Sequence, residues 1–261
     1  MMQVTTIENL SAAPPQDGKV LAGGTLLMRE VNYRPHQVPH ILRITDPGFA
    51  RIERRGSQIA IGAGATMTDI IRSSDLAALA PAARAIGGPA IRNMATVGGN
   101  LFAPHPYGDF ATALLALGAQ VQWADGRTED IEAFLSNRAS ARGIVAAVLI
   151  DPPRADALRF AKVSRTKPKG VSVLSIAVHI DGMGRQVNAA RIAFGAMGPT
   201  PLRAKAAEAA LAGKTLDAQG VAAACAACAN DLAPADDALA SAWYRREVAP
   251  IHLRRLLLGE R

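Results

Sequence analysis

The chain has 261 residues, of which 49% are hydrophobic and 4% aromatic, and its formal net charge is +7. This length can bury a sizeable core, in one large domain or in two to three small ones, and no apolar run approaches the roughly 18 residues of a membrane span. Two cysteines exclude a disulfide framework. The scattered basic residues, with few aromatics for stacking and no helix-turn-helix or zinc-finger spacing, argue against nucleic-acid binding.

A basic surface of this kind favours an acidic partner or an anionic cofactor instead. The first twenty residues lack a basic segment followed by an apolar stretch, so a secretory signal is not expected and a cytoplasmic location is.

The first half of the chain alternates short strands, glycine turns and helices. Apolar runs and apolar–polar alternation predict strands at residues 19–22, 40–46, 58–65, 119–123 and 144–151. Helical spacing predicts helices at residues 26–31, 67–76, 76–88 and 109–118. Thr66 or Thr68 can cap the second of these helices, with Asp69 favourable in its first turn.

The pattern changes near residue 155, which is the natural domain boundary. Residues 158–166 and 171–197 predict antiparallel strands with a hairpin turn at Asp181-Gly182. Alanine-rich segments after Pro201 predict helices up to the C-terminus. The sequence therefore predicts an α+β fold whose second domain combines antiparallel strands with helices.

Three glycine pairs follow predicted strands: Gly23-Gly24, Gly62-x-Gly64 and Gly98-Gly99. Glycine can turn backbone N–H groups toward a bound anion, and two such loops facing each other could hold a pyrophosphate. Taken alone, any one pair is better explained as an ordinary tight turn. Gly62-x-Gly64 is not a Rossmann fingerprint, because Met67 stands where the third glycine belongs and no acid follows about 20 residues on.

The segments "VLAGGTLLM" and "IRNMATVGGNL", which begin at Val20 and Ile91, resemble the two flavin loops of the FAD-binding medium subunit of the molybdenum hydroxylases. This is the family of xanthine dehydrogenase and aerobic carbon monoxide dehydrogenase. The segments "IAIGAGATMTDI", "GDFATALLALGA", "RFAKVSR", "IAFGAMGPTPLRAKAAEAALAGKTL" and "SAWYRREVAPIHLRRLL" match the family in order, so the resemblance covers nearly the whole chain.

The resemblance implies a two-lobed FAD-binding domain of the PCMH type at residues 1–155, with lobes at about 1–50 and 51–155. It implies a C-terminal domain of the carbon monoxide dehydrogenase flavoprotein type at residues 156–261. FAD would be bound here without a covalent link, whereas molybdopterin would lie in a large partner subunit and two [2Fe–2S] clusters in a small one. A dimer of such heterotrimers is the family expectation.

The resemblance also implies which residues bind FAD. Two loops would wrap the pyrophosphate with backbone N–H groups, one from each side; they consist of Leu21, Ala22, Gly23, Gly24, Thr25, Leu26 and Leu27, and of Thr96, Val97, Gly98, Gly99 and Asn100. Asp109 would accept a hydrogen bond from a ribose or ribityl hydroxyl. Ile144 would meet the adenine side, and Phe160 and Lys162 would lie near the isoalloxazine. The absence of acids between Asp75 and Asp109 would then avoid repelling the phosphates.

The chain departs from the family pattern in two places. Leu26 replaces the usual aspartate of the first loop, so any role of that side chain is lost. The stretch "APHPYGD" places His105 and Tyr107 near the expected flavin, either as residues that shape the cleft or as a gate or acceptor contact.

No catalytic constellation and no metal site is expected in this chain. Cys225-x-x-Cys228 stands alone in an alanine-rich helix, so buried structural thiols are the favoured reading. Asp236-Asp237 is read as a helix cap or a solvated loop. Arg245-Arg246 and Arg254-Arg255 are read as the polar face of the last helix, with a subunit contact as the alternative.

The sequence thus predicts an oxidoreductase subunit that passes electrons from a partner's iron–sulfur clusters to an acceptor such as NAD⁺, O₂ or a quinone-type carrier. A stand-alone FAD-dependent oxidoreductase and a scaffold subunit that has lost FAD are the alternatives. The hydroxylated substrate and the acceptor are not readable from the sequence.

Overall fold

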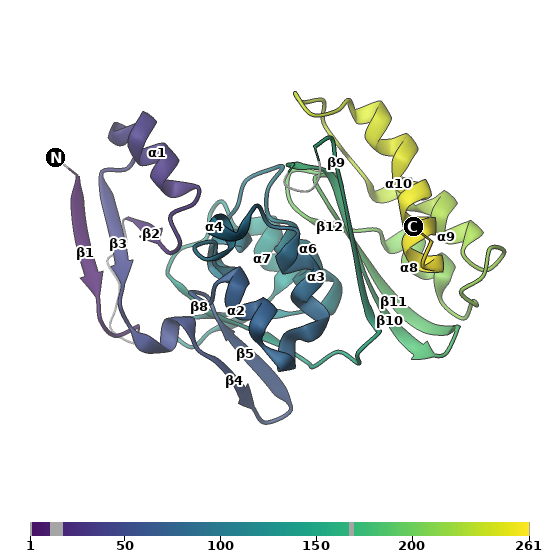
Figure 1. Cartoon of the computed structure of the whole chain (residues 1–261), viewed down its shortest axis with the longest axis horizontal. Helices are drawn as coiled ribbons and strands as arrows, with labels where there is room; N and C mark the ends of the chain where they lie inside the picture. The colour runs from purple at the N-terminus through teal and green to yellow at the C-terminus, as the bar shows by residue number, and fades with distance from the viewer. Residues whose placement is uncertain (1, 11–17, 167–169, 261) are drawn as a thin grey trace.

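The computed structural model of the chain describes residues 2–10, 18–166 and 170–260. Part of the N-terminal segment on which the expectation about a secretory signal rests lies outside these residues. Three β-sheets follow one another along the length of the molecule, as Figure 1 shows. No helix of the described ranges is both long and apolar enough to cross a bilayer.

The N-terminal lobe is a small sheet in which every neighbouring pair of strands is parallel, in the order β1-β3-β2. Its elements are β1 (Gln3–Ile7), β2 (Lys19–Leu21), α1 (Leu27–Tyr33), η1 (Pro35–Gln37) and β3 (His40–Ile44). The turn between β2 and α1 carries Gly23-Gly24, and it points toward the centre of the molecule (Figure 1).

The central unit is built on an antiparallel sheet in the order β4-β5-β8-β6-β7. Its strands are β4 (Ile52–Arg55), β5 (Gln58–Gly62), β6 (Gln120–Trp123), β7 (Thr128–Asp130) and β8 (Val145–Ile150). Its helical elements are η2 (Pro47–Ala50), α2 (Met67–Arg72), η3 (Ser74–Leu79), α3 (Ala80–Arg84), α4 (Pro89–Arg92), α5 (Val97–Leu101), α6 (Asp109–Leu117) and α7 (Ile131–Asn137).

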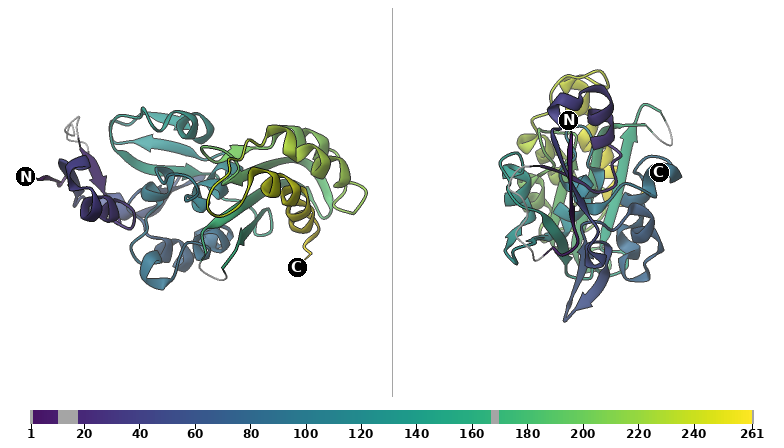
Figure 2. Two further views of the ribbon diagram at one scale, coloured as in Figure 1. Left: turned by 90° about the horizontal axis from the view of Figure 1, so that it is seen from above. Right: turned by 90° about the vertical axis from the view of Figure 1, so that its left-hand side faces the viewer.

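The C-terminal part is a second antiparallel sheet, in the order β12-β11-β10-β9, with helices on one face (Figures 1 and 2). Its strands are β9 (Leu158–Ser164), β10 (Ser172–Met183), β11 (Gln186–Gly195) and β12 (Leu202–Arg203). Its helical elements are α8 (Lys205–Leu211), α9 (Ala222–Ala227), η4 (Cys228–Asp231) and α10 (Ala242–Leu258). The α+β fold class predicted from the sequence is confirmed.

Helix α6 is the centre of the molecule, because all nine of its residues are buried. The alternation of side chains along a strand lets the C-terminal sheet use both of its faces. Ala177 of β10 and Ala193 of β11 join the core around α6. Ile176 and Phe194, one residue away on each strand, join the second core under α8, α9 and α10. The sheet therefore separates α6 from the C-terminal helices.

The sequence predicts the hairpin turn of the second domain at Asp181-Gly182, but the turn lies further along the chain. Strand β10 continues to Met183, which pairs with Gln186, and the register instead shifts between Asp181 and Gly182. An Asp-Gly pair is typical of a two-residue turn, but it also suits a β-bulge, where one strand carries an extra residue. The apolar–polar periodicity of the sequence cannot distinguish a turn from a bulge at this position.

The predicted helix cap at Thr66 is present in full. The Thr66 hydroxyl accepts from the Asp69 N–H at 3.1 Å, and the Asp69 carboxylate accepts in return from the Thr66 N–H at 2.9 Å. This reciprocal pair satisfies two backbone donors at the start of α2. The glycines just before it serve packing: a Cβ at Gly62 would lie 2.4 Å from the Phe49 carbonyl oxygen, and one at Gly64 would lie 2.5 Å from the Phe49 ring.

Candidate functional site: a pocket between two glycine segments

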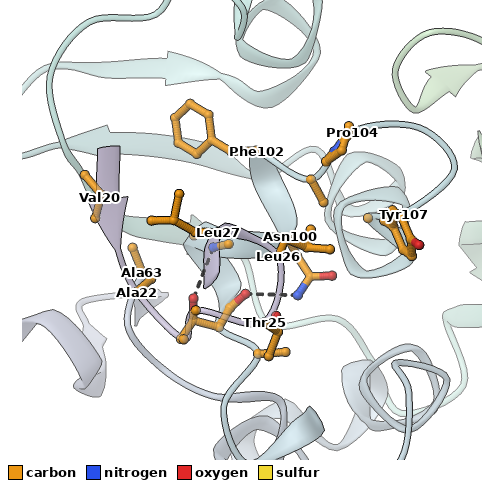
Figure 3. Close-up of a pocket in the computed structure, with 18 of the residues that line it drawn as sticks. Val20, Ala22, Thr25, Leu26, Leu27, Ala63, Asn100, Phe102, Pro104 and Tyr107 are labelled. Atoms are coloured by element: carbon orange, nitrogen blue, oxygen red, sulfur yellow. Dashed lines mark hydrogen bonds between the residues drawn. The ribbon is translucent and has the colours of Figure 1, made fainter. Parts of the chain in front are cut away.

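A pocket of about 650 Å³ lies where the N-terminal lobe meets the central unit and the C-terminal sheet. Most of its wall comes from four parts of the chain: the β2–α1 turn with its flanks, residues 86–109, residues 141–145, and strand β9 with the residues after it. Phe49 and Ala63 complete the lining. Figure 3 shows Thr25 and Asn100 near its middle, with Phe102 toward one side and Tyr107 toward the other. A pocket of this volume suits a ligand of cofactor size.

The two glycine segments touch each other through Gly23. A Cβ on Gly23 would lie 1.5 Å from the carbonyl oxygen of Met94, so only glycine permits this approach of one backbone to another. The next residue, Gly24, has φ +69°, a left-handed backbone conformation that residues other than glycine rarely adopt. The two glycines are thus needed for different physical reasons: Gly23 for a close contact and Gly24 for a turn.

The first glycine segment presents free backbone donors to the pocket. In the described parts of the chain, no oxygen accepts a hydrogen bond from the N–H groups of five consecutive residues, which are Ala22, Gly23, Gly24, Thr25 and Leu26. All five line the pocket. A row of unpaired N–H groups along a concave wall is an anion site that needs no lysine and no metal ion.

The second segment does not present its N–H groups in the same way, which corrects the expectation from the sequence. Residues 97–101 form the short helix α5, and the N–H groups of its start are already used. Val97 and Gly98 donate to the carbonyls of Ala65 and Ala63, at 2.9 and 2.7 Å. Gly99 donates to the Thr96 hydroxyl at 3.1 Å, which is the helix cap.

The second segment instead contributes a wall of the pocket without side chains at its glycines, together with the polar side chain of Asn100. Gly98 packs on the central unit, since a Cβ there would lie 3.0 Å from Cβ of Ala63. Gly99 is exposed to the pocket, and its Cβ would meet only the Thr96 hydroxyl, at 3.1 Å. The Asn100 side chain donates to the Thr96 carbonyl at 2.9 Å, which fixes its amide in the pocket wall (Figure 3).

Asp109 and Lys162 form a buried ion pair at the pocket wall. The Lys162 ammonium lies 2.9 Å from the Asp109 carboxylate and also donates to the Ala85 carbonyl at 2.9 Å. The Ser172 hydroxyl donates to the other Asp109 oxygen at 2.6 Å. Their side chains are only 6% and 13% exposed, so the pair is held in place rather than free in solvent. Strands β9 and β10 thereby anchor the first residue of α6.

The pocket brings together most of the predicted binding residues. Those in its wall are Ala22, Gly23, Gly24, Thr25, Leu26, Leu27, Thr96, Gly98, Gly99, Asn100, Asp109, Ile144 and Lys162. Three predicted residues are not part of the wall. Leu21 ends β2, Val97 is fully buried in the central core, and Phe160 packs against that core.

The sequence reasoning did not single out Phe102 or Pro104, which both line the pocket. Phe102 carries a signal that could have found it, because it is a large apolar residue two positions after a predicted binding asparagine. Pro104 carries no such signal. Tyr107, noted as a departure from the family, does line the pocket.

His105 turns away from the pocket wall and joins the C-terminal part. Its ring nitrogen lies 3.1 Å from the Asp237 carboxylate. The same Asp237 oxygen accepts from the Arg245 guanidinium at 2.8 Å. The loop before α6 is therefore tied to the start of α10 by a His105–Asp237–Arg245 chain of polar contacts.

The sequence predicts that Arg245 lies on the polar face of the last helix, but in the structure Arg245 is fully buried. Besides Asp237, its guanidinium donates to the carbonyls of Val173, Ala235 and Ala240 at 2.8, 2.7 and 3.0 Å. A buried arginine needs several acceptors, and helical periodicity alone cannot show that they exist. Asp236 does act as a cap near the start of α10, because it accepts from the Ala242 N–H.

Asp237 is held in its charged form by this network. Burial would raise the pKa of its carboxyl, but hydrogen bonds from Arg245, from the Leu239 and Ala240 N–H groups and from His105 outweigh burial, so the pKa lies well below its ordinary range. A group whose pKa is lowered on folding stabilises the folded state above its unfolded pKa, about 3.9 for aspartate, and this stabilisation is lost as the pH falls through the folded value.

We therefore expect Asp237→Asn to lower the melting temperature at neutral pH, and we expect the difference from the parent chain to shrink as the pH falls below about 4. Thermal unfolding followed by circular dichroism from pH 7 to pH 2 measures this directly. Because asparagine does not titrate, the difference between the melting temperatures of parent and variant at each pH cancels the contributions of the other carboxylates. Curves that stay parallel down to pH 2 would contradict the lowered pKa.

The two cysteines are buried structural thiols, as predicted. Burial and the neighbouring thiol raise the pKa of Cys228 to about 12, so it is protonated and unreactive at neutral pH. Within the described residues, no group of three or more histidine, cysteine or acidic side chains is placed to hold a metal ion.

Comparison with known proteins decides the family. Residues 2–150 match the family described as the FAD binding domain in molybdopterin dehydrogenase, and residues 159–259 match the CO dehydrogenase flavoprotein C-terminal domain. The chain belongs to the FAD-binding subunits of the molybdenum hydroxylase family. It is thus a flavoprotein-type subunit of an oxidoreductase, which confirms the resemblance recognised in the two loops.

Relatives of this FAD-binding subunit span most of its length. It is 35% identical over 218 residues to the nicotinate dehydrogenase FAD-subunit of Eubacterium barkeri, covering 76% of this chain and 72% of the relative. It is 29% identical over 253 residues to the carbon monoxide dehydrogenase medium chain of Hydrogenophaga pseudoflava, covering 92% and 88%. A solved structure of carbon monoxide dehydrogenase from the same organism superimposes with a TM-score of 0.85 at 28% identity, covering 98% of this chain and 96% of that one.

FAD fits the groups that this FAD-binding subunit provides. The free N–H groups of residues 22–26 suit a pyrophosphate, which carries negative charge and only accepts hydrogen bonds. Gly99 is a cradle position where a larger side chain would enter the pocket, whereas Gly23 lets the first segment approach the backbone of Met94. Among the described residues, the acids of the pocket wall are Glu30 and Asp109, and each is paired with a lysine.

Proposed function

We propose that this chain is the electron-transfer flavoprotein subunit of a molybdenum-containing hydroxylase or dehydrogenase. A small partner subunit with two [2Fe–2S] clusters delivers electrons, a large molybdopterin subunit oxidises the substrate, and an external acceptor is reduced at this subunit. Two relatives whose names describe a medium chain and an FAD-subunit support this assignment. The observation that carries it is the row of five unpaired N–H groups on the pocket wall.

Each residue of the site then has a defined task. The N–H groups of residues 22–26 bind the pyrophosphate, and Thr25 and Asn100 add side-chain donors. Asp109 accepts from a hydroxyl of the ribose or ribityl chain with the lone pairs that Ser172 and Lys162 leave unused. Bound FAD supplies the redox chemistry, and the protein contributes binding, orientation and electrostatics.

Lys162 is the group that tunes the charge near the flavin ring. Its ammonium is 13% exposed, and besides Asp109 and the Ala85 carbonyl it has a third N–H for a ligand. A fixed positive charge at this wall favours a ligand that gains negative charge, which a flavin does on reduction. The strand β9 holds this lysine in place between α6 and α3.

Domain division and assembly are part of the same proposal. Residues 1–155 form the FAD-binding domain and residues 156–261 the C-terminal domain, a division supported by matches that end at 150 and begin at 159. The complex is a dimer of heterotrimers in the cytoplasm. The two free cysteines fit a reducing compartment.

The absorbance spectrum of the purified chain, with and without co-expressed neighbouring genes, tests the proposal. We expect flavin bands near about 370 and 450 nm and co-purification of molybdenum and iron–sulfur subunits. A yellow chain that purifies alone and oxidises a substrate by itself would indicate a stand-alone FAD-dependent oxidoreductase. A colourless chain that takes up no added FAD would indicate a scaffold subunit that has lost the cofactor.

A further inference from the structure

Phe102 is a large apolar side chain that stays 44% exposed although it lies in the pocket wall. It follows α5 directly, two residues after Asn100, at one side of the pocket in Figure 3. Exposed single apolar residues are common on protein surfaces, but one inside a ligand pocket marks a surface that a ligand can cover.

The Phe102 ring is held from behind by a chain of aromatic contacts. It meets Phe134 edge to face, with ring centres 5.3 Å apart and an interplanar angle of 85°. Phe134 is 1% exposed, and its ring centre lies 5.8 Å from that of Trp123. The Arg127 guanidinium lies over the Trp123 ring, 5.0 Å from its centre. The contact to Phe134 is the favourable geometry for an aromatic pair, and it orients Phe102 before any ligand binds.

The two ends of the pocket differ in chemistry. Around Phe102 the wall is apolar, with Ile144 and Gly143, and Gly143 backs onto the Trp123 ring. The opposite end carries the Asp109–Lys162 ion pair beside Tyr107. The row of free N–H groups lies in the β2–α1 turn between these ends, where Figure 3 shows Thr25.

A dinucleotide cofactor has one ring system on each side of its pyrophosphate. If the pyrophosphate binds the N–H row, the ring that gains charge on reduction suits the end with the Lys162 ammonium. The uncharged adenine then suits the apolar end. Adenine has a flat face that stacks on an aromatic side chain and tolerates apolar neighbours.

We propose that Phe102 is the stacking platform for the adenine ring of FAD, and that it gives this subunit its preference for FAD over FMN. This inference rests on the proposed function, since it assumes that the pocket binds a flavin. Phe102 is a binding residue and takes no part in electron transfer. Val20, which Figure 3 shows on the same side as Phe102, and Ile144, which also lines the pocket, would enclose the purine from its sides.

Titration of FAD and FMN into the flavin-free full-length chain, followed by flavin fluorescence, tests the proposal. Loss of base stacking weakens binding by about 10- to 100-fold. We expect Phe102→Ala to weaken FAD binding by about this factor and to change FMN binding by less than about 3-fold. Phe102→Leu keeps an apolar side chain without a ring, so it should lose most of the same affinity even if Phe102→Ala folds poorly. Phe102→Tyr should restore it.

Trp243→Ala is the matched control, because Trp243 is an aromatic side chain on α10 that is 70% exposed and not part of the pocket wall. It should bind FAD as the parent does. ADP should compete with FAD for the parent chain, and it should compete much less for Phe102→Ala.

The outcomes separate the two proposals. A parent chain that binds no FAD would overturn the proposed function. A parent chain that binds FAD, with a folded Phe102→Leu variant that binds it equally well, would overturn only the role of Phe102. Equal losses for FAD and FMN would place Phe102 at the flavin ring and would also overturn the assignment to adenine.

Discussion

Gly99→Val is expected to weaken FAD binding by roughly 100-fold, which corresponds to about 2.8 kcal/mol, while the chain stays folded. Gly99 lies in the pocket wall and is exposed, and among the described residues outside its own helix backbone a Cβ there would meet only the Thr96 hydroxyl, at 3.1 Å. The valine side chain would therefore occupy space that the pyrophosphate needs, opposite the free N–H groups of the first segment. Gly99→Ala should give an intermediate loss.

Two other valine variants make the result specific. Gly98→Val should unfold or strongly destabilise the chain, because a Cβ there would lie 3.0 Å from Cβ and 3.1 Å from the carbonyl oxygen of Ala63. Ala226→Val changes an exposed alanine of α9 and should leave FAD affinity unchanged. Fluorescence titration gives the affinity and circular dichroism gives the fold. If Gly99→Val bound FAD as tightly as the parent, the second segment would not face the pyrophosphate.

Arg245→Met should destabilise the folded chain by about 3–5 kcal/mol, as is typical when one partner of a buried charged pair is removed. The variant keeps a long apolar side chain, so the loss reports the polar contacts more than the packing. Three backbone carbonyls and the Asp237 carboxylate would lose the hydrogen bonds that the guanidinium donates to them. Arg245→Lys should recover only part of the loss, because one ammonium cannot reproduce the planar arrangement of a guanidinium.

Arg254→Met is the control for this change, since Arg254 lies on the same helix but is 46% exposed and paired with Glu260. Exposed pairs contribute about 1 kcal/mol or less. Urea unfolding of the three variants measures the free energies of unfolding. Equal losses for Arg245→Met and Arg254→Met would mean that the burial of Arg245 does not matter for stability.

The sequence was a good guide to the elements with strong periodicity and clear caps. Helix α6 was predicted over residues 109–118 because it is apolar all round, and it is fully buried. The start of α2 followed from Thr66 and Asp69 three residues apart. In the N-terminal lobe β2 and β3 were predicted, but β1 was not, since it carries little apolar alternation and is stabilised by its parallel pairing with β3, in which Gln3 pairs with His40.

In the binding site too, features with a local sequence signal could be predicted and contacts between distant segments could not. The Gly23-Gly24 pair could be read as part of a cradle, but its contact with the Met94 carbonyl could not, because no local pattern reports a close approach across about seventy residues. The segment at Gly98-Gly99 was expected to turn and forms helix α5 instead, where the glycines are needed for proximity and not for a left-handed backbone. The burial of Arg245 depends on carbonyls from β10 and from the loop before α10, which periodicity does not show.

The contact between Gly23 and Met94 has a consequence for genetics. The atom that would obstruct a side chain at position 23 is a main-chain carbonyl oxygen, 1.5 Å from the Cβ site. Every residue type at position 94 carries that oxygen, so no second substitution there can compensate for a change at Gly23. Suppressors of a Gly23 allele would have to move one of the two backbone segments away from the other.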